Sequence, residues 1–388
     1  MWKSLAANAL TLIIVGMVVL AGIVGWGQAQ YRGAGPLVSP ICLRVESGTN
    51  MRRIADDLET RGAISSAQIF RMGAEYSGRS SLLKAGSFLV PTAAPMTDIV
   101  DIITRGGRST CGTEVVYRIG IASQEIEVRT LDPETERFVV QAEFDPSEEA
   151  VAPDYVDVRD EADTRYRISL AEGVTSWQVV QALNLADFLD GTVDDLPGEG
   201  TLAPESYEVR AGTPRGDVLG QMAELQSERL AEAWANRDEN LPVESPEDAL
   251  ILASIIEKET GLPDERETVA SVFVNRLRLG MRLQTDPTVI YGVTEGRGIL
   301  GRGLRQSELR QETPWNTYVI DGLPPTPIAN PGLGAIRAAL NPAETDLIFF
   351  VADGSGGHAF AETLAEHNAN VAKWRQIERE RANSASDN

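Results

Sequence analysis

A long run without charge near the N-terminus constrains this chain most. From Ser4 to Tyr31 there is no Asp, Glu, Lys or Arg, and residues 5–26 are almost entirely apolar. As a helix, such a run crosses a hydrocarbon core of about 30 Å. It exceeds the apolar region of about 7–15 residues in a cleavable signal peptide. We therefore expect a retained transmembrane anchor rather than a removed leader.

The flanks of this run predict its orientation. Lys3 precedes it and Arg32 follows it, so the charge bias is weak, but the N-terminal flank is only a few residues long. We expect residues 1–32 to form a short cytoplasmic tip and one membrane-spanning helix, with the remaining chain outside the cytoplasm. There Cys42 and Cys111 can form a disulfide; two separate buried thiols are the alternative.

The composition narrows the chemistry further. The 388 residues include 57 acidic and 35 basic side chains, a formal net charge of −22, which opposes binding to nucleic acid. The chain has two histidines and two cysteines, too few for a multi-histidine zinc site or a zinc finger. We expect no metal and no cofactor. Carboxylates are the abundant reactive groups that remain.

Two strand–turn–helix units repeat along the chain. Residues 43–45 read as a strand that leads through Gly48 into a helix, and residues 166–170 lead through Gly173 in the same way. The repetition indicates small α+β modules rather than one large sheet. Chance similarity between two short amphipathic units is the alternative.

The segment between these units is strongly acidic. Residues 112–165 hold 15 Asp and Glu against 5 Arg, a net charge of −10. Alternating side chains predict strands at residues 125–129 and 137–141, joined by an Asp-Pro turn. Residues 145–163 have a loop-like composition. We expect residues 108–165 to form an inserted, β-rich excursion with a solvated acidic surface.

Helical patterns dominate the rest of the chain. We expect helices over residues 214–237 and 264–279, another that starts near residue 245, and strands near residues 317–320 and 347–351. The expected fold is α+β, with an anchor (1–32), a first module (41–107), the acidic excursion (108–165), a second unit (166–213), a mostly helical domain with short strands (214–380) and a polar tail (381–388).

One apolar helix ends in two carboxylates. Residues 249–256 are nearly all apolar, so a helix there is buried, and Glu257 and Glu259 follow. The side chains on the face of Glu259 are large and aliphatic, whereas those behind Glu257 are smaller and partly polar. Burial and the negative helix end would raise the pKa of Glu259, as a general acid requires. The alternative is that both carboxylates cap the helix and pair with basic residues.

Polar and aromatic side chains follow this helix. Residues 282–288 are polar, and residues 315–318 join two aromatic rings to an amide and a hydroxyl. Such groups suit sugars, which present hydroxyls together with apolar ring faces. A glycine pattern at residues 296–301 has no clear strand before it and no convincing helix after it, so we interpret it as a hairpin tip rather than a nucleotide site.

Several strings in this half of the chain resemble the YceG-like family, the MltG endolytic murein transglycosylases. The likeness is dense from about residue 250 to 374, and the anchor and the LysM-like units agree in order. The acidic excursion does not match the family pattern, and Ala203 stands where the family has an aromatic residue. The strings are residues 252–260 (LASIIEKET), 270–277 (ASVFVNRL), 280–291 (GMRLQTDPTVIY), 316–318 (NTY), 322–325 (GLPP), 328–332 (IANPG), 350–354 (FVADG) and 357–360 (GHAF).

The resemblance implies a reaction and places its catalytic acid at Glu259. In it, the β-1,4 bond between N-acetylmuramic acid and N-acetylglucosamine is cleaved without water. Glu259 would protonate the leaving oxygen and then take the proton of the muramyl C6 hydroxyl, which closes onto C1 as a 1,6-anhydro ring. The candidates for positioning the glycan are Gln284, Thr285, Asp286, Asn316, Tyr318 and His358.

The resemblance also implies partners and a location. We expect peptidoglycan strands as substrate, peptidoglycan synthases as partners, and a single-pass inner-membrane protein with its catalytic domain in the periplasm. For Asp286 and Asn275 a turn or packing role is the alternative, and for His358 a plain surface position.

Two other functions are compatible with the same residues. A hydrolytic muramidase would need a second carboxylate, Asp286 or Glu257, to activate water. A non-catalytic, membrane-tethered glycan-binding scaffold would need no catalytic acid.

Overall fold

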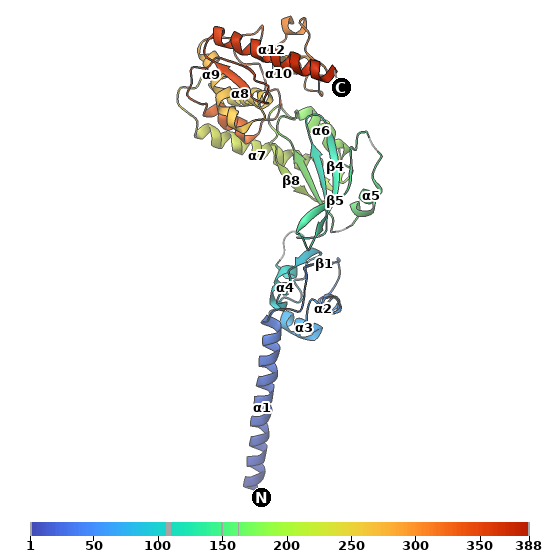
Figure 1. The fold of residues 1–388 in the computed structure, drawn as a ribbon. Helices are drawn as coiled ribbons and strands as arrows, with labels where there is room; N and C mark the ends of the chain where they lie inside the picture. Colours follow the sequence, from blue (N-terminus) through green and yellow to red (C-terminus); the bar gives the residue numbers. More distant parts are fainter. Residues whose placement is uncertain (1, 106–109, 149, 162, 387–388) are drawn as a thin grey trace. The chain divides into compact units, whose positions relative to one another are not determined.

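The structure is a computed structural model that describes residues 2–105, 110–148, 150–161 and 163–386 (Figure 1). Two compact units divide the chain. The first comprises residues 1–115, 127–143 and 151–165, and the second comprises residues 116–126, 144–150 and 166–388.

Helix α1 (Trp2–Arg32) covers the apolar run for which a membrane anchor was expected. Its stretch Leu10–Arg32 is long and apolar enough to cross a membrane, and none of it is buried within the protein. Leu12, for example, is 73% exposed. The core helix of a soluble protein would bury such side chains, so the exposed apolar surface fits a helix that packs against lipid.

The first unit carries a small module after α1. Its sheet is an antiparallel pair in which Ile41 lies opposite Val90 and Val45 opposite Gly86. Helices pack their apolar sides against this pair, and Phe70 lies at the centre of the core. The elements are β1 (Ile41–Val45), α2 (Met51–Thr60), α3 (Ala67–Tyr76), β2 (Gly86–Val90) and α4 (Met96–Thr104).

The two expected strand–turn–helix units have matching backbones. Gly48 and Gly173 both have φ of +80°, a conformation that favours glycine. Asn50 caps α2, and Thr175 caps α6 (Ser176–Leu185) in a capping box with Gln178. The predicted turns and helix starts are confirmed in both places.

A disulfide joins Cys42 on β1 to Cys111, with Cα atoms 5.7 Å apart. The chain therefore has the pairing rather than two separate thiols. A hydrogen bond from the Ser87 hydroxyl to Asp163 links β2 to the end of the acidic segment within the same unit. Together these bonds tie distant parts of the first unit to its small sheet.

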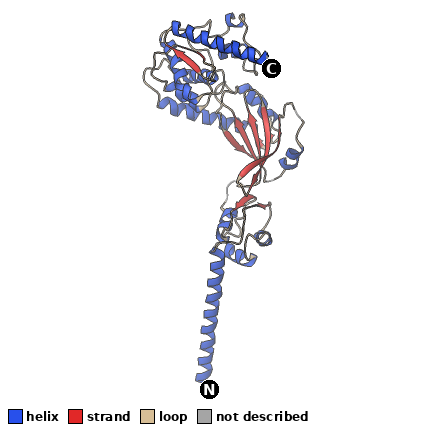
Figure 2. Ribbon diagram, viewed as in Figure 1, coloured by secondary structure: helices blue, strands red, loops and turns tan. Residues whose placement is uncertain are grey.

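The acidic segment supplies three strands to a five-stranded sheet with the order β5-β4-β3-β6-β8 (Figure 2). The predicted strands and the turn between them are confirmed. Residues 153–159 form a helix where a loop was expected. The elements are β3 (Thr113–Ile119), β4 (Gln124–Asp132), β5 (Arg137–Phe144), α5 (Pro153–Arg159), β6 (Arg165–Leu170) and β8 (Ser206–Val209).

Part of the acid in this sheet is buried rather than solvated. Glu114 is 1% exposed and Glu127 is 4% exposed, and Arg129 pairs with both, at 2.6 and 3.3 Å. The expectation of a solvated acidic surface was therefore wrong for these residues, because Arg129 on β4 compensates the charge of Glu127 on the same strand and of Glu114 on the neighbouring strand β3.

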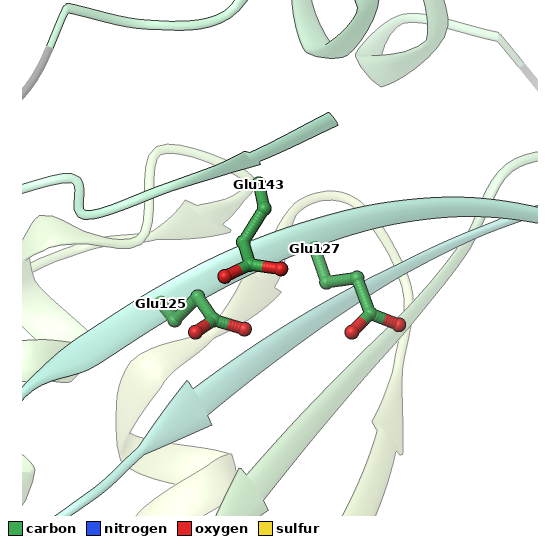
Figure 3. A group of neighbouring side chains, drawn as sticks. All are labelled: Glu125, Glu127 and Glu143. Atoms are coloured by element: carbon green, nitrogen blue, oxygen red, sulfur yellow. The ribbon is translucent and has the colours of Figure 1, made fainter. Parts of the chain in front are cut away.

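Figure 3 shows three carboxylates of the same sheet, with Glu125 and Glu127 on β4 and Glu143 on β5. Arg118 donates a hydrogen bond to Glu125 at 3.2 Å, and Arg129 pairs with Glu127. Arginines thus balance two of the three charges, and we assign no cation site to this group.

The second unit contains a domain built around one buried helix, α8. Helices α9 and α11 pack on α8, and Leu252, Ala253 and Ile255 of α8 are fully buried. This confirms the prediction of a helix that is covered on nearly every side. The elements are β7 (Leu189–Asp190), β9 (Thr213–Pro214), α7 (Arg215–Ala235), α8 (Pro246–Glu259), η1 (Pro263–Glu265), α9 (Arg266–Arg278), α10 (Asp286–Thr294), η2 (Glu308–Arg310), α11 (Leu333–Leu340), β10 (Phe349–Ala352), β11 (His358–Ala361) and α12 (Leu364–Ser386).

Three local features of this domain differ from the expectations. Residues 317–320 form turns rather than a strand, because the Asn316 side chain accepts a hydrogen bond from the Tyr318 backbone N–H and closes a local turn. Residues 286–294 form α10, a helix that was not predicted and that begins inside the polar run of residues 282–288. Helix α12 continues through Ser386, past the point where the polar tail was expected to begin.

The disulfide predicts a local stability effect. Replacing both cysteines, Cys42→Ser with Cys111→Ser, should lower the free energy of unfolding of the first module by about 2–4 kcal/mol, because the unfolded chain regains the freedom that the cross-link removes. Hydrogen exchange of the full chain in detergent should show faster exchange in residues 41–104 and unchanged exchange in α8 and α11. Equal protection in both proteins would contradict this.

Candidate active site

Glu259 is the last residue of α8, so the buried helix delivers its carboxyl group to the edge of the core. Ser245 starts this helix by accepting a hydrogen bond from the Asp248 backbone N–H. The hydroxyl of Thr285 donates a hydrogen bond to Glu259 Oε1. In the described part of the chain, no hydrogen bond reaches Oε2. A proton on this carboxyl would therefore sit on Oε2, the oxygen that remains available to a substrate.

Burial raises the pKa of the Glu259 carboxyl above its ordinary value. The hydrogen bond from Thr285, the charge of His358 when its ring is protonated and the charge of Arg276 oppose this rise, whereas the negative charge of Asp286 adds to it. The direction is the one a general acid needs near neutral pH.

A network of threonines fixes the hydroxyl that contacts Glu259. The Thr285 backbone N–H donates to Thr317 Oγ1 at 3.1 Å, and the hydroxyls of Thr288 and Thr317 lie 2.9 Å apart. All three residues are buried. Gln284 precedes them with φ of +48°, and its backbone N–H donates to the Thr317 carbonyl, while the residue itself is exposed.

Asp286 and Tyr318 form a second pair near Glu259. The Tyr318 hydroxyl donates to Asp286 Oδ1 at 2.7 Å. Burial, and next the hydrogen bond to Asp286, raise the pKa of Tyr318, so it stays a neutral donor. Its neutral hydroxyl orients the carboxylate of Asp286, which begins α10.

Arg276 is a charged neighbour of Glu259 that sequence reasoning did not single out. It is buried on α9, and it donates to the carbonyl of Ile348 at 2.7 Å and to that of Leu283. Its charge opposes the rise in the pKa of Glu259. A lone arginine on the mostly apolar side of a helix was the signal that could have identified it.

Asn316 has a bracing role in the structure. Its fully buried amide donates to the carbonyls of Glu308, Leu309 and Gln311, and its oxygen accepts from Tyr318. The amide of Asn316 therefore holds the surrounding loop through its hydrogen bonds. Asn275 is similar, because it donates to the carbonyls of Thr345 and Leu347.

His358 lies on β11 and bonds to Glu265, which precedes α9. The His358 backbone N–H donates to Glu265 Oε1 at 2.9 Å, and His358 Nδ1 lies 2.8 Å from Glu265 Oε2. The side chain of His358 is 15% exposed. Glu265 was missed because nothing in the local sequence separates it from the neighbouring acidic residues.

Comparison with known proteins assigns most of the chain to one family. The model of the YceG-like family matches residues 43–373. This chain belongs to the YceG-like family.

Named relatives of this YceG-like chain are endolytic murein transglycosylases. That of Streptococcus pneumoniae serotype 2 is 27% identical over 342 residues, which cover 86% of this chain and 58% of the relative. That of Bacillus subtilis is 36% identical over 179 residues, 46% of this chain and 48% of the relative. The chain thus spans about half the length of the curated relatives it matches. A solved YceG-like protein of Listeria monocytogenes has 24% identity and a TM-score of 0.45, covering 85% of this chain and 98% of its own.

Glu257, the other carboxylate at the end of α8, has different partners. It accepts a hydrogen bond from the Gly332 backbone N–H at 2.9 Å, and Arg266 lies 3.9 Å away. Its side chain is 5% exposed, and burial raises its pKa too. Glu259 is nevertheless the more deeply buried of the two, as expected, although residues distant in sequence also cover Glu257. Both burial and partners distinguish the two carboxylates of this YceG-like chain.

The raised pKa of Glu259 predicts a pH-dependent stability difference. As pH rises above about 4.5, the unfolded chain ionises this group first, so the wild type loses stability until pH passes the folded pKa. Glu259→Gln has no such loss, and its free energy of unfolding should exceed that of the wild type by about 1–3 kcal/mol at pH 8. The two proteins should converge near about pH 4. Denaturant unfolding between these pH values measures the difference; a wild type that is more stable at pH 8 would contradict a raised pKa.

Proposed function

We propose that this chain is a membrane-anchored endolytic peptidoglycan lytic transglycosylase. It cleaves the β-1,4 bond between N-acetylmuramic acid and N-acetylglucosamine within nascent glycan strands and leaves 1,6-anhydro ends, which terminates strand elongation. The observation that carries the proposal is Glu259, a buried carboxyl with a raised pKa, one oxygen held by Thr285 and the other available. The relatives named endolytic murein transglycosylases support the same reaction.

One carboxyl group serves both steps of this reaction. Glu259 donates its proton to the glycosidic oxygen as the bond to the muramyl C1 breaks, which releases the 4-hydroxyl of N-acetylglucosamine. The resulting carboxylate takes the proton of the muramyl C6 hydroxyl while O6 bonds to C1. Glu259 ends protonated, and no water is consumed. During the carboxylate stage, the Thr285 hydroxyl and the Arg276 charge stabilise the negative group.

A hydrolytic muramidase is less well supported by the same residues. It would need a second carboxylate free to activate water. Glu257 accepts the Gly332 N–H, and Asp286 accepts the Tyr318 hydroxyl. Asp286 is nevertheless exposed near Glu259, so the products decide between the two reactions.

Helix α1 and the disulfide support the proposed location. An exposed apolar helix near the N-terminus fits a single-pass inner-membrane anchor, and a disulfide is typical of an oxidising compartment such as the periplasm. We place the catalytic domain there, with peptidoglycan as substrate and peptidoglycan synthases as partners. The first module, which we compare to LysM, would add a glycan contact outside the site.

Digestion of peptidoglycan tests the reaction. Wild-type protein should release fragments with 1,6-anhydro-muramic acid ends, detected by mass spectrometry. Glu259→Gln should lower the rate by about 100- to 10,000-fold, because it cannot donate or accept the proton. Glu257→Gln is the matched control on the same helix end, and it should give the same anhydro products.

Other outcomes would separate the alternatives. Reducing-end muramic acid would support a hydrolase and contradict the lytic reaction. Cleavage by Glu259→Gln at the wild-type rate would remove the assignment of the catalytic acid. Binding of glycan without any cleavage by the wild type would support the scaffold.

A further inference from the structure

Both hydrogen-bond donors of His358 go to one carboxylate. The backbone N–H of His358 and its ring Nδ1 reach the two oxygens of Glu265, at 2.9 and 2.8 Å. A carboxylate only accepts, so Nδ1 carries the proton in this pair. In the neutral ring, Nε2 is then an acceptor.

The packing around His358 leaves its ring little freedom to turn. The Phe350 ring meets it edge-on, with ring centres 5.1 Å apart, and Phe360 lies 6.2 Å away. Opposite His358 on the β10–β11 hairpin is Ala352. The His358 ring is therefore held by the phenylalanine rings of the hairpin and, at Nδ1, by the Glu265 carboxylate.

The backbone next to His358 is shaped to admit this carboxylate. A Cβ atom at Gly357 would lie 2.5 Å from Glu265 Oε1. Any side chain at this position would push the carboxylate away. A substitution at Gly357 can therefore displace the Glu265 carboxylate without removing its charge.

The second ring nitrogen of His358, Nε2, takes no part in the pair with Glu265. Over the residues that the structure describes, Nε2 has no hydrogen-bond partner, although Nδ1 is fully engaged. His358 also lies close enough to Glu259 for its protonated ring to influence the pKa of that carboxyl. The pair therefore leaves one nitrogen available on a residue near the proposed catalytic carboxyl.

We propose that Glu265 is a positioning residue: it holds His358 in the Nδ1–H form, so that Nε2 accepts a hydrogen bond from a glycan hydroxyl beside Glu259. The identity of the ligand rests on the proposed transglycosylase function, whereas the tautomer of His358 does not. Misplacing a group that contacts the reacting substrate by about 1 Å costs up to about 100-fold in rate.

Two variants disturb the pair in different ways. Glu265→Gln replaces one acceptor oxygen with an NH₂ group, which favours the Nε2–H form and turns the available acceptor into a donor. Gly357→Ala displaces the carboxylate and keeps its charge. The matched control is Glu267→Gln, because Glu267 lies exposed on the first turn of α9 and loses the same charge.

Histidine-selective ¹⁵N NMR of the full chain in detergent micelles reads the tautomer directly. The chain has two histidines, so His367→Gln assigns the two ring spectra. The wild type and Glu267→Gln should show the Nδ1–H form of His358, and Glu265→Gln and Gly357→Ala should lose it. An Nε2–H form in the wild type would overturn the proposal without any variant.

Kinetics on peptidoglycan supply the second measurement. Glu265→Gln and Gly357→Ala should lower kcat by about 10- to 100-fold and leave KM within about 2-fold, with unchanged thermal unfolding midpoints. Glu267→Gln should match the wild type. If both variants lost the tautomer with normal kcat, or kept the tautomer, the positioning role would be wrong.

The two measurements also separate this proposal from the proposed function. A wild type that formed no anhydro ends would contradict the transglycosylase reaction, while the NMR spectrum would still report whether Glu265 sets the tautomer. If Glu265→Gln failed to fold, Gly357→Ala and the wild-type spectrum would decide the question alone.

Discussion

The burial of α8 is the constraint on which the rest of the site depends. Its aliphatic side chains are covered by α9 and α11, so the helix can neither rotate nor slide without opening the core. Glu259 follows directly from this fixed helix. Its carboxyl therefore stays at the edge of the core, where burial favours the neutral form. A carboxyl on a surface helix would turn to water and keep its ordinary pKa.

Helix α9 organises the groups around that carboxyl. Arg276 donates to the carbonyls of Leu283 and Ile348, which tie the loop before Thr285 and the start of β10 to one side chain. Glu265 holds β11 at the opposite end of the same helix. Helix α9 thus helps to place the loop before Thr285, the His358 ring and the Arg276 charge, which preorganises the surroundings of Glu259.

Buried charges in this protein are compensated by neighbouring groups. Arg129 pairs with Glu114 and Glu127 inside the sheet, so part of the acidic segment is neutralised where it folds. Near Glu259, positive charges likewise act at short range, where they oppose the rise in pKa that burial causes. The net charge of −22 therefore opposes partners such as nucleic acid, but it says little about the chemistry of the site.

Local patterns were enough to predict the exposed apolar helix, the turns at Gly48 and Gly173, the buried helix α8 and the candidate acid at its end. These features depend on neighbouring residues, because periodicity and caps act within a few positions. The tertiary structure alone decided the burial of Glu257, the bracing role of Asn316 and the pairing of Glu265 with His358, which are 93 residues apart. Such contacts form only when distant segments pack together, so no local pattern records them.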